Sequence, residues 1–315
     1  MEPNDPARAP HTLSDACRCP NGPCYRADHA MIPSDRPRPS RPETRELAEL
    51  RALKVRLPEL APAVDMQIEL VDLQRRIQLR VSTPSPVPVA ERQARLRQGR
   101  RALELGDLPI EWADAGLAAR QTADILHRHD VLDSTDHRDL VAVVREGADL
   151  APLVAAWYAE TAQGPHTATS SIRPPMLDDV LQLALRPFFG RAVEVAERGV
   201  DLGDWRQPWC PFCGASPDFA VYVDDGRRQL ICSRCVGRWD WETVACPWCP
   251  NRDRRQLPSF TSGDRRYRLC GCDGCRRYLK AYNAKGAPRP VMPAVDSIAT
   301  LPLDAAAVQR GYVGG

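Results

Sequence analysis

Four CxxC pairs follow one another in the second half of the chain: CPFC at 210–213, CSRC at 232–235, CPWC at 246–249 and CDGC at 272–275. Two residues between a pair of cysteines let one tight turn present both sulfur atoms to the same ion, and two such turns complete a tetrahedral four-thiolate site. A CxxC pair can also be a redox dithiol, but the βαβ pattern typical of a thioredoxin-like fold is missing here. The pairs therefore predict metal ligation by Cys210, Cys213, Cys232, Cys235, Cys246, Cys249, Cys272 and Cys275.

The gaps between the pairs indicate which of them share an ion. Asp225 and Gly226 lie between the first and second pairs, and Ser262, Gly263 and Asp264 lie between the third and fourth. Such turn residues favour a hairpin that folds one pair back onto the preceding one, as in a zinc ribbon or a rubredoxin knuckle. We expect sequential pairing, with an interleaved arrangement of the first and third pairs as the alternative. Iron and zinc both stay open, because tetrahedral four-sulfur sites accept either.

The other four cysteines lie outside this pattern. Cys270 does not fit the CxxC spacing, and we interpret it as a buried thiol that is not a metal ligand. Cys17, Cys19 and Cys24 belong to residues 1–42, a Pro-rich leader without apolar periodicity. Such a composition predicts disorder, and we assign these three thiols no role.

Composition bears on the class of protein and its compartment. The chain has 315 residues, of which 43% are hydrophobic and 27% charged, with a formal net charge of +2, so it can bury a core. No apolar run approaches the ~20 residues of a membrane helix, and the first residues show no signal sequence. Because a reducing cytoplasm keeps thiols available for metal, we expect a cytoplasmic protein without a membrane segment.

Residues 43–199 have the periodicity of helices. Leu47, Leu50 and Leu53 begin a pattern of apolar residues three and four apart that recurs along this region. Prolines at 58, 62 and 84–88 interrupt the pattern. The region is therefore predicted to be an all-α N-terminal domain of six to eight helices.

Residues 200–285 have a different character. Helix formers become fewer, and β-prone pieces appear at 219–223, 228–232 and 267–269, which predicts a small β-rich domain. Residues 286–315 are predicted to be a C-terminal tail with a short helix over 304–310 that ends at Gly311. The expected fold class is α+β, with the helical domain followed by tandem rubredoxin-like or zinc-ribbon CxxC knuckle modules.

The sequence argues against catalysis. It contains no dinucleotide-binding glycine motif, phosphate loop, nucleophile elbow or HExxH motif. A metal ion whose four ligands are all protein thiolates also lacks the open position that hydrolytic catalysis requires. We therefore expect no enzyme activity.

A basic surplus leaves two further functions to consider. Lys and Arg outnumber Asp and Glu by 15 to 8 between residues 205 and 285, which makes a zinc-ribbon nucleic-acid-binding protein the alternative function. The helical domain shows no basic helix of the kind that recognises nucleic acid, so we consider nucleic acid an unlikely partner. Electron transfer through rubredoxin-type iron is a third and weaker hypothesis.

The neighbours of the four pairs form a distinctive run. It reads WCPFCGASP at 209–217, GRRQLICSRCVGRW at 226–239, CPWC at 246–249, CDGCRRYLK at 272–280 and VDSIATLPLDAAAVQRGY at 295–312. In this combination the motifs resemble the FdhE family of formate dehydrogenase accessory proteins. The resemblance covers residues 174–315 well, the helical part only in its pattern and the leader not at all.

The resemblance implies a function that spacing alone does not. It implies a cytoplasmic bacterial protein, needed for active respiratory formate dehydrogenase, that binds the molybdenum- or tungsten-containing catalytic subunit during maturation and does not itself turn over formate. It also implies that the same eight cysteines are metal ligands, with iron as the metal and zinc as the alternative. Self-association is left open.

Two positions depart from the pattern of that family. Pro250 follows the third pair where a glycine is usual, and Thr243 stands near the place where arginine is expected. Because proline has no amide hydrogen to donate to a ligand sulfur, we expect the second site to differ in detail from the first.

Overall fold

The computed structural model describes residues 44–84, 87–145, 147–160 and 176–314. The leader at 1–42, with Cys17, Cys19 and Cys24, lies outside the described residues, so the expectation for it stays a prediction. The described residues form one compact unit.

Seven α-helices precede the strands in the described part of the chain, within the predicted six to eight. They are α1 (Arg45–Arg56), α2 (Ala61–Gln78), α3 (Val89–Arg97), α4 (Trp112–Arg128), α5 (Ser134–Arg145), α6 (Gly147–Glu160) and α7 (Leu177–Ala196), with short 3-10 turns at Pro58–Leu60 and Leu105–Asp107. Pro58 begins its turn after α1 has ended, with only Leu57 between them, so it interrupts the helical pattern as predicted. Pro62, in contrast, lies in the first turn of α2, where the missing amide hydrogen is not needed by the helix. Within the described residues, no helix has both the length and the apolar character required to span a membrane.

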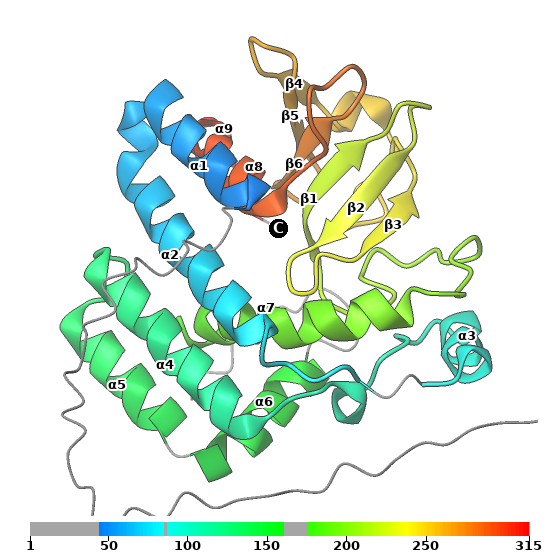
Figure 1. The fold of residues 1–315 in the computed structure, drawn as a ribbon. Helices are drawn as coiled ribbons and strands as arrows, with labels where there is room; N and C mark the ends of the chain where they lie inside the picture. The colour runs from blue at the N-terminus through cyan, green and yellow to red at the C-terminus, as the bar shows by residue number, and fades with distance from the viewer. Residues whose placement is uncertain (1–43, 85–86, 146, 161–175, 315) are drawn as a thin grey trace, which may run out of the picture. The chain divides into compact units, whose positions relative to one another are not determined.

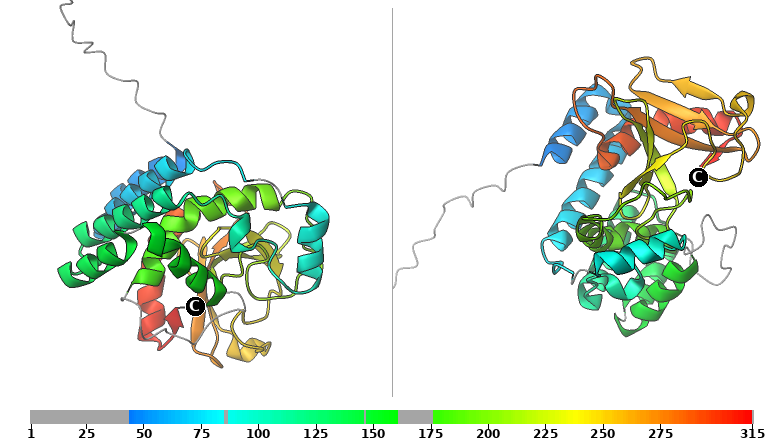
Figure 2. Two further views of the ribbon diagram at one scale, coloured as in Figure 1. Left: turned by 90° about the horizontal axis from the view of Figure 1, so that it is seen from below. Right: turned by 90° about the vertical axis from the view of Figure 1, so that its right-hand side faces the viewer.

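Helix α7 lies between the other helices and the strands. It contacts α2 and α4, and its Phe188 and Phe189 are completely buried. Figure 1 shows α7 running across one end of the strands, and the right-hand view of Figure 2 shows the strands on one side of it and α4, α5 and α6 on the other. This helix therefore connects the helical part to the strand-rich part.

The strands form one mixed sheet. They are β1 (Pro217–Tyr222), β2 (Arg228–Cys232), β3 (Arg238–Trp241), β4 (Ser259–Thr261), β5 (Tyr267–Gly271), β6 (Arg277–Asn283) and β7 (Val313–Gly314). Their order is β3-β2-β1-β6-β5-β4, and β7 pairs with β6. The β1–β6 pair is parallel, with Phe219 opposite Lys280, whereas β1–β2, β2–β3, β4–β5 and β5–β6 are antiparallel. The hairpins expected around Gly226 and Gly263 are both present.

The sheet contains two copies of one motif. In each copy a CxxC pair precedes a strand, a hairpin follows, and a second CxxC pair begins at the end of the second strand and leads into a third. The backbone hydrogen bonds repeat as well, because the amide of Cys232 donates to the carbonyl of Gly237 (3.0 Å) and that of Cys272 to the carbonyl of Arg277 (2.9 Å). The parallel β1–β6 pair joins the two copies edge to edge.

The C-terminal residues contain more helix than predicted. Two helices, α8 (Pro293–Ala299) and α9 (Leu301–Gln309), stand where one helix over 304–310 was expected. Each helix has a proline in its first turn, where proline initiates a helix rather than breaking it, and this explains the underestimate. Gly311, with φ of 74°, follows the end of α9, as predicted for a C-terminal glycine.

The helical and strand-rich parts share a core. One continuous cluster of buried apolar side chains extends from Leu73 of α2 through Phe188 of α7 to Phe212 and Trp239 beside the first CxxC pairs. The α+β fold class, with helices followed by a sheet that carries the CxxC pairs, is confirmed. The division at 199 and 285 into separate domains stays a prediction.

Candidate metal centres

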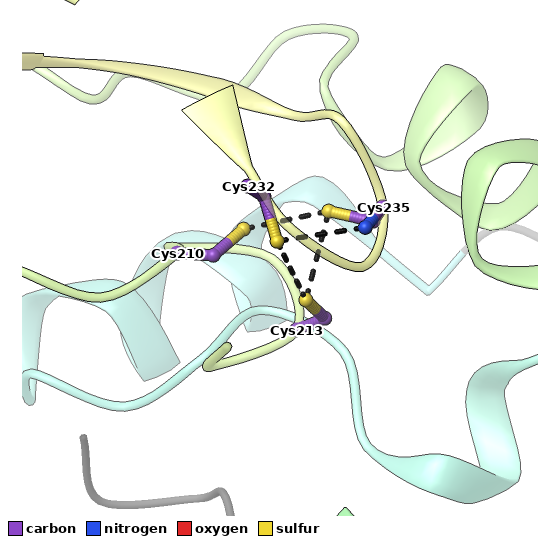
Figure 3. Close-up of side chains that lie close together, drawn as sticks. All are labelled: Cys210, Cys213, Cys232 and Cys235. Atoms are coloured by element: carbon purple, nitrogen blue, oxygen red, sulfur yellow. Dashed lines mark hydrogen bonds between the residues drawn. The ribbon is translucent and has the colours of Figure 1, made fainter. Parts of the chain in front are cut away.

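The first two CxxC pairs converge at one point. Cys210 Sγ lies 3.5 Å from Cys235 Sγ, and Cys213 Sγ lies 3.4 Å from Cys232 Sγ and 3.6 Å from Cys235 Sγ. Figure 3 shows the four sulfur atoms pointing toward one another from two facing turns. We call this group the first cluster.

The third and fourth pairs form an equivalent group, the second cluster. Cys246 Sγ lies 3.6 Å from Cys275 Sγ, and Cys249 Sγ lies 3.6 Å from Cys272 Sγ. In both clusters all four sulfur atoms lie within 4.8 Å of one another. The structure therefore groups the thiols sequentially and not in the interleaved arrangement.

The geometry of both clusters fits a tetrahedral metal ion. Four sulfur atoms at the usual metal–sulfur distance of ~2.3 Å stand about 3.8 Å apart, slightly more than the shortest distances here. Backbone amides point at the sulfur atoms, since Phe212 donates to Cys210 Sγ and Trp248 donates to Cys246 Sγ, both at 3.4 Å. An all-sulfur donor set of this kind suits Zn²⁺ or iron, and four protein ligands close the coordination sphere.

The turns that present these thiols require unusual backbone conformations. Val236 and Arg276, each directly after the last cysteine of its cluster, have φ of 54° and 58°. Gly214 has φ of 79°, and its amide donates to the carbonyl of Cys210 (3.0 Å) rather than to a sulfur atom. Pro250, its counterpart in the second cluster, cannot make that bond. Proline in place of glycine at residue 250 thus removes a backbone hydrogen bond of the turn and not a hydrogen bond to sulfur.

The two clusters differ in exposure. All four cysteines of the first cluster are buried, whereas Cys249 and Cys275 of the second are partly exposed. The second cluster is therefore open to solvent on one side, and the first lies inside the shared core.

Protonation of the thiols is uneven in both clusters. Burial raises the pKa of Cys210 and Cys235. Burial also opposes ionisation of Cys213, but hydrogen bonds from the other three thiols hold its pKa well below the ordinary value. In the second cluster, burial raises the pKa of Cys246, whereas hydrogen bonds from the amide of Cys275 and from neighbouring thiols outweigh burial and lower the pKa of Cys272 to about 7. Each cluster thus has one thiol inclined to ionise, and binding a cation releases the remaining protons.

A buried arginine accompanies the first cluster. Arg234 is 1% exposed, and its guanidinium carbon lies 3.9 Å from the centre of the Trp157 ring of α6. Its backbone amide donates to Cys232 Sγ (3.4 Å), and its positive charge helps to lower the pKa of Cys213. Arg234 therefore sets a positive charge beside thiolates that a divalent ion does not neutralise completely.

The helical part holds the turns of the first cluster. The amides of Ala102 and Leu103 donate to the carbonyls of Pro211 and Phe212 at 2.7 Å and 3.0 Å. Arg186 of α7 donates to the carbonyl of Ser233 (2.7 Å). No spacing in the sequence marks these supports, because they join segments far apart in the chain.

Cys270 and the histidines of the helical part lie outside the clusters. Cys270 is partly exposed rather than buried, and its sulfur lies 3.6 Å from the Tyr222 hydroxyl. His127 lies in the last turn of α4, and its ring stacks on that of His137 with 4.5 Å between the ring centres. His129 Nε2 lies 3.0 Å from Glu69 Oε1. Among the described residues, only the two cysteine clusters bring three or more potential His, Cys, Asp or Glu ligands together.

Comparisons with known proteins point to one family. No family model matches the chain. It is 32% identical over 146 residues to an FdhE homolog from Stutzerimonas stutzeri (strain A1501), covering 42% of this chain and 48% of that protein. It is 33% identical over 110 residues to an FdhE homolog from Shewanella sp. (strain MR-4), covering 34% and 36%, and 29% identical over 114 residues to one from Aquifex aeolicus (strain VF5), covering 35% and 40%. The chain thus matches less than half the length of these relatives.

A solved structure shares the fold. The crystal structure of the FdhE protein from Pseudomonas aeruginosa superposes with a TM-score of 0.60, covering 85% of this chain and 92% of that one. The sequence identity is 18%, so this likeness speaks for the fold alone.

Proposed function

We propose that the chain is a member of the FdhE family and acts as a non-enzymatic maturation factor for a respiratory formate dehydrogenase. It acts in the cytoplasm, where it binds the catalytic subunit of that enzyme during assembly or activation. The observation that carries the proposal is the combination of two closed four-cysteine clusters with the family's sequence motifs and fold.

We further propose that the eight cysteines hold two metal ions, iron in each site with zinc as the alternative. Cys210, Cys213, Cys232 and Cys235 hold the first ion. Cys246, Cys249, Cys272 and Cys275 hold the second. Rubredoxin-type iron supplies one-electron chemistry, whereas zinc supplies only structure. With every coordination position taken by protein, neither ion has a vacant position for a substrate, which supports a role in folding or recognition over hydrolytic catalysis.

A deletion strain tests the maturation role. Loss of the gene should abolish respiratory formate oxidation while the catalytic-subunit polypeptide persists, and the full-length chain should restore activity. A tagged chain should also retain the catalytic subunit on a column, with a variant lacking the second cluster (Cys246→Ser and Cys249→Ser) as the comparison. Normal formate oxidation in the deletion strain overturns the proposal.

Metal analysis after anaerobic purification tests the sites. Two ions per chain are expected, and a visible thiolate-to-iron absorption separates iron from zinc. Size-exclusion chromatography of the same sample reports self-association.

Nucleic-acid binding is the second candidate, because Arg254 and Arg255 are exposed on the basic strand-rich part. Electrostatic contacts to phosphates are strongest at low salt, so binding to DNA or RNA should appear at ~50 mM salt and decline steeply as salt is added. Its absence under that condition excludes this candidate.

A further inference from the structure

A cavity of about 330 Å³ lies beside the second cluster. Residues of β1, β2, β4 and β5 line it together with the loop at 243–248, and Cys246 and Cys272 of the second cluster form part of its wall. Thr243 lines it too. Its volume is at the lower end of the range typical of small-molecule sites.

The charged residues that line the cavity are all positive. Arg228, Arg254 and Arg268 all line the cavity, and no Asp or Glu is among the lining residues. A four-thiolate site with Zn²⁺ carries a charge of −2, so the adjoining metal centre offsets part of this positive charge but not all of it. The cavity therefore favours an anion.

Three hydrogen-bond donors around the cavity lack partners. Arg228 Nε, Arg268 Nε and Trp248 Nε1 are buried and have no hydrogen-bond partner among the described residues. Arg228 is only 4% exposed, and its Nη1 donates to the carbonyl of Ala245 (3.1 Å), which fixes its guanidinium in place. Buried donors are normally paired, so these three groups are candidates for hydrogen bonds to an occupant of the cavity.

The cavity also has an apolar wall. Val244, Pro247, Trp248 and Leu257 line it, so an occupant that carries only charge would leave this surface uncovered. We propose that the cavity binds a small organic phosphate, whose phosphate group accepts hydrogen bonds from the arginines while its apolar or aromatic body packs against this wall. Guanidinium groups bind phosphate oxygens in pairs, and a phosphate offers three terminal oxygens to the arginines where a carboxylate offers two. This inference does not depend on the role in formate dehydrogenase maturation.

Calorimetric titration of the metal-loaded full chain with phenyl phosphate tests the proposal. We expect saturable binding at low salt, weaker binding of inorganic phosphate, which lacks the apolar body, and weaker binding of benzoate, which offers two acceptor oxygens rather than three. Absence of phenyl phosphate binding overturns the proposal, as does benzoate binding of equal strength.

A matched pair of variants locates the site. Arg254→Gln removes a lining guanidinium from an exposed position and should weaken phenyl phosphate binding about tenfold, the usual effect of losing one charge-assisted hydrogen bond. Arg255→Gln removes the same charge from the neighbouring residue, whose side chain is 93% exposed and which does not line the cavity, and should bind as the unmodified chain does. Arg268→Gln provides a second lining variant. Equal losses in Arg254→Gln and Arg255→Gln contradict a specific site.

Cys270 provides an independent readout of position. Its thiol lines the cavity and belongs to neither cluster, so an alkylating reagent can reach it while the other thiols there hold metal. Phenyl phosphate should slow alkylation of Cys270, measured by peptide mass spectrometry, and Arg254→Gln should require about tenfold more of it for the same protection. Alkylation that is unchanged at saturating phenyl phosphate overturns the placement.

Discussion

Gly237 occupies a position where no side chain fits. A Cβ atom at this residue would approach Phe212 Cδ2 to 2.9 Å and Cys235 Sγ to 3.2 Å. Both neighbours are buried, so neither can move freely. We expect Gly237→Ala to lower the free energy of unfolding by about 1–3 kcal/mol, the usual effect of overpacking, and to weaken metal retention at the first cluster.

Urea unfolding and metal analysis measure this effect. Gly263→Ala is the matched control, because a Cβ there meets no atom within 4 Å, and it should leave stability and metal content nearly unchanged. Identical behaviour of the two variants contradicts the close packing around Cys235.

Single cysteine changes should separate the two metal centres. Cys213→Ser and Cys249→Ser should each lower the metal content from two ions per chain to one, because loss of one thiolate leaves an incomplete site. Cys213 is fully buried in the shared core and Cys249 is partly exposed, so Cys213→Ser should lower the thermal midpoint more.

Cys270→Ser is the control for both changes. Its thiol belongs to neither cluster, so this variant should keep both ions and a nearly unchanged thermal midpoint. Loss of an ion from Cys270→Ser refutes the assignment of ligands.

The parts of the site that sequence predicts are those determined over short spans. The hairpin at Asp225 and Gly226 and the convergence of each pair of CxxC turns follow from a few adjacent residues, and the structure contains both. The stacking of Arg234 on Trp157 was not predictable, because it joins a turn to a helix through the tertiary fold. The parallel pairing of β1 with β6, which unites the two motif copies, was missed for the same reason.

At the scale of elements, α8 is attached to the sheet through one buried carboxylate. Asp296 is completely buried and accepts hydrogen bonds from Arg289 Nη2 (2.6 Å), the Tyr267 hydroxyl (2.7 Å) and the amide of Met292 (2.7 Å). Arg289 also lies 3.3 Å from Glu49 of α1, so the network joins α1, α8 and β5. Asp296→Ala leaves Arg289 buried with only Glu49 as a carboxylate partner.

We expect Asp296→Ala to lower the free energy of unfolding by about 3 kcal/mol, the lower end of the range for breaking a buried ion pair. Asp304→Ala is the comparison, because its side chain is 25% exposed where it pairs with Lys280, and it should cost less. Chemical denaturation measures both. A larger loss for Asp304→Ala contradicts the importance of the buried network.

At the scale of the whole molecule, the two cysteine clusters have different surroundings. The first lies in the core that α7 shares with the sheet, whereas the second is reached from solvent through Cys249 and Cys275. A chelator should therefore reach an ion bound at the second cluster sooner than one bound at the first. Protons compete with metal for thiolates, so affinity at both sites falls as the pH is lowered.

We therefore expect metal release by a chelator in two kinetic phases, with the second-cluster ion leaving first. The fast phase should leave the helical circular dichroism signal almost intact, because the second cluster is not part of the shared core. The slow phase should reduce both that signal and the thermal midpoint, because Cys210 and Cys213 belong to the same buried cluster as side chains of α7. Cys249→Ser should lack the fast phase and Cys213→Ser the slow one. Release of both ions in a single phase, with loss of helical signal throughout, would mean that the second cluster also supports the helical part.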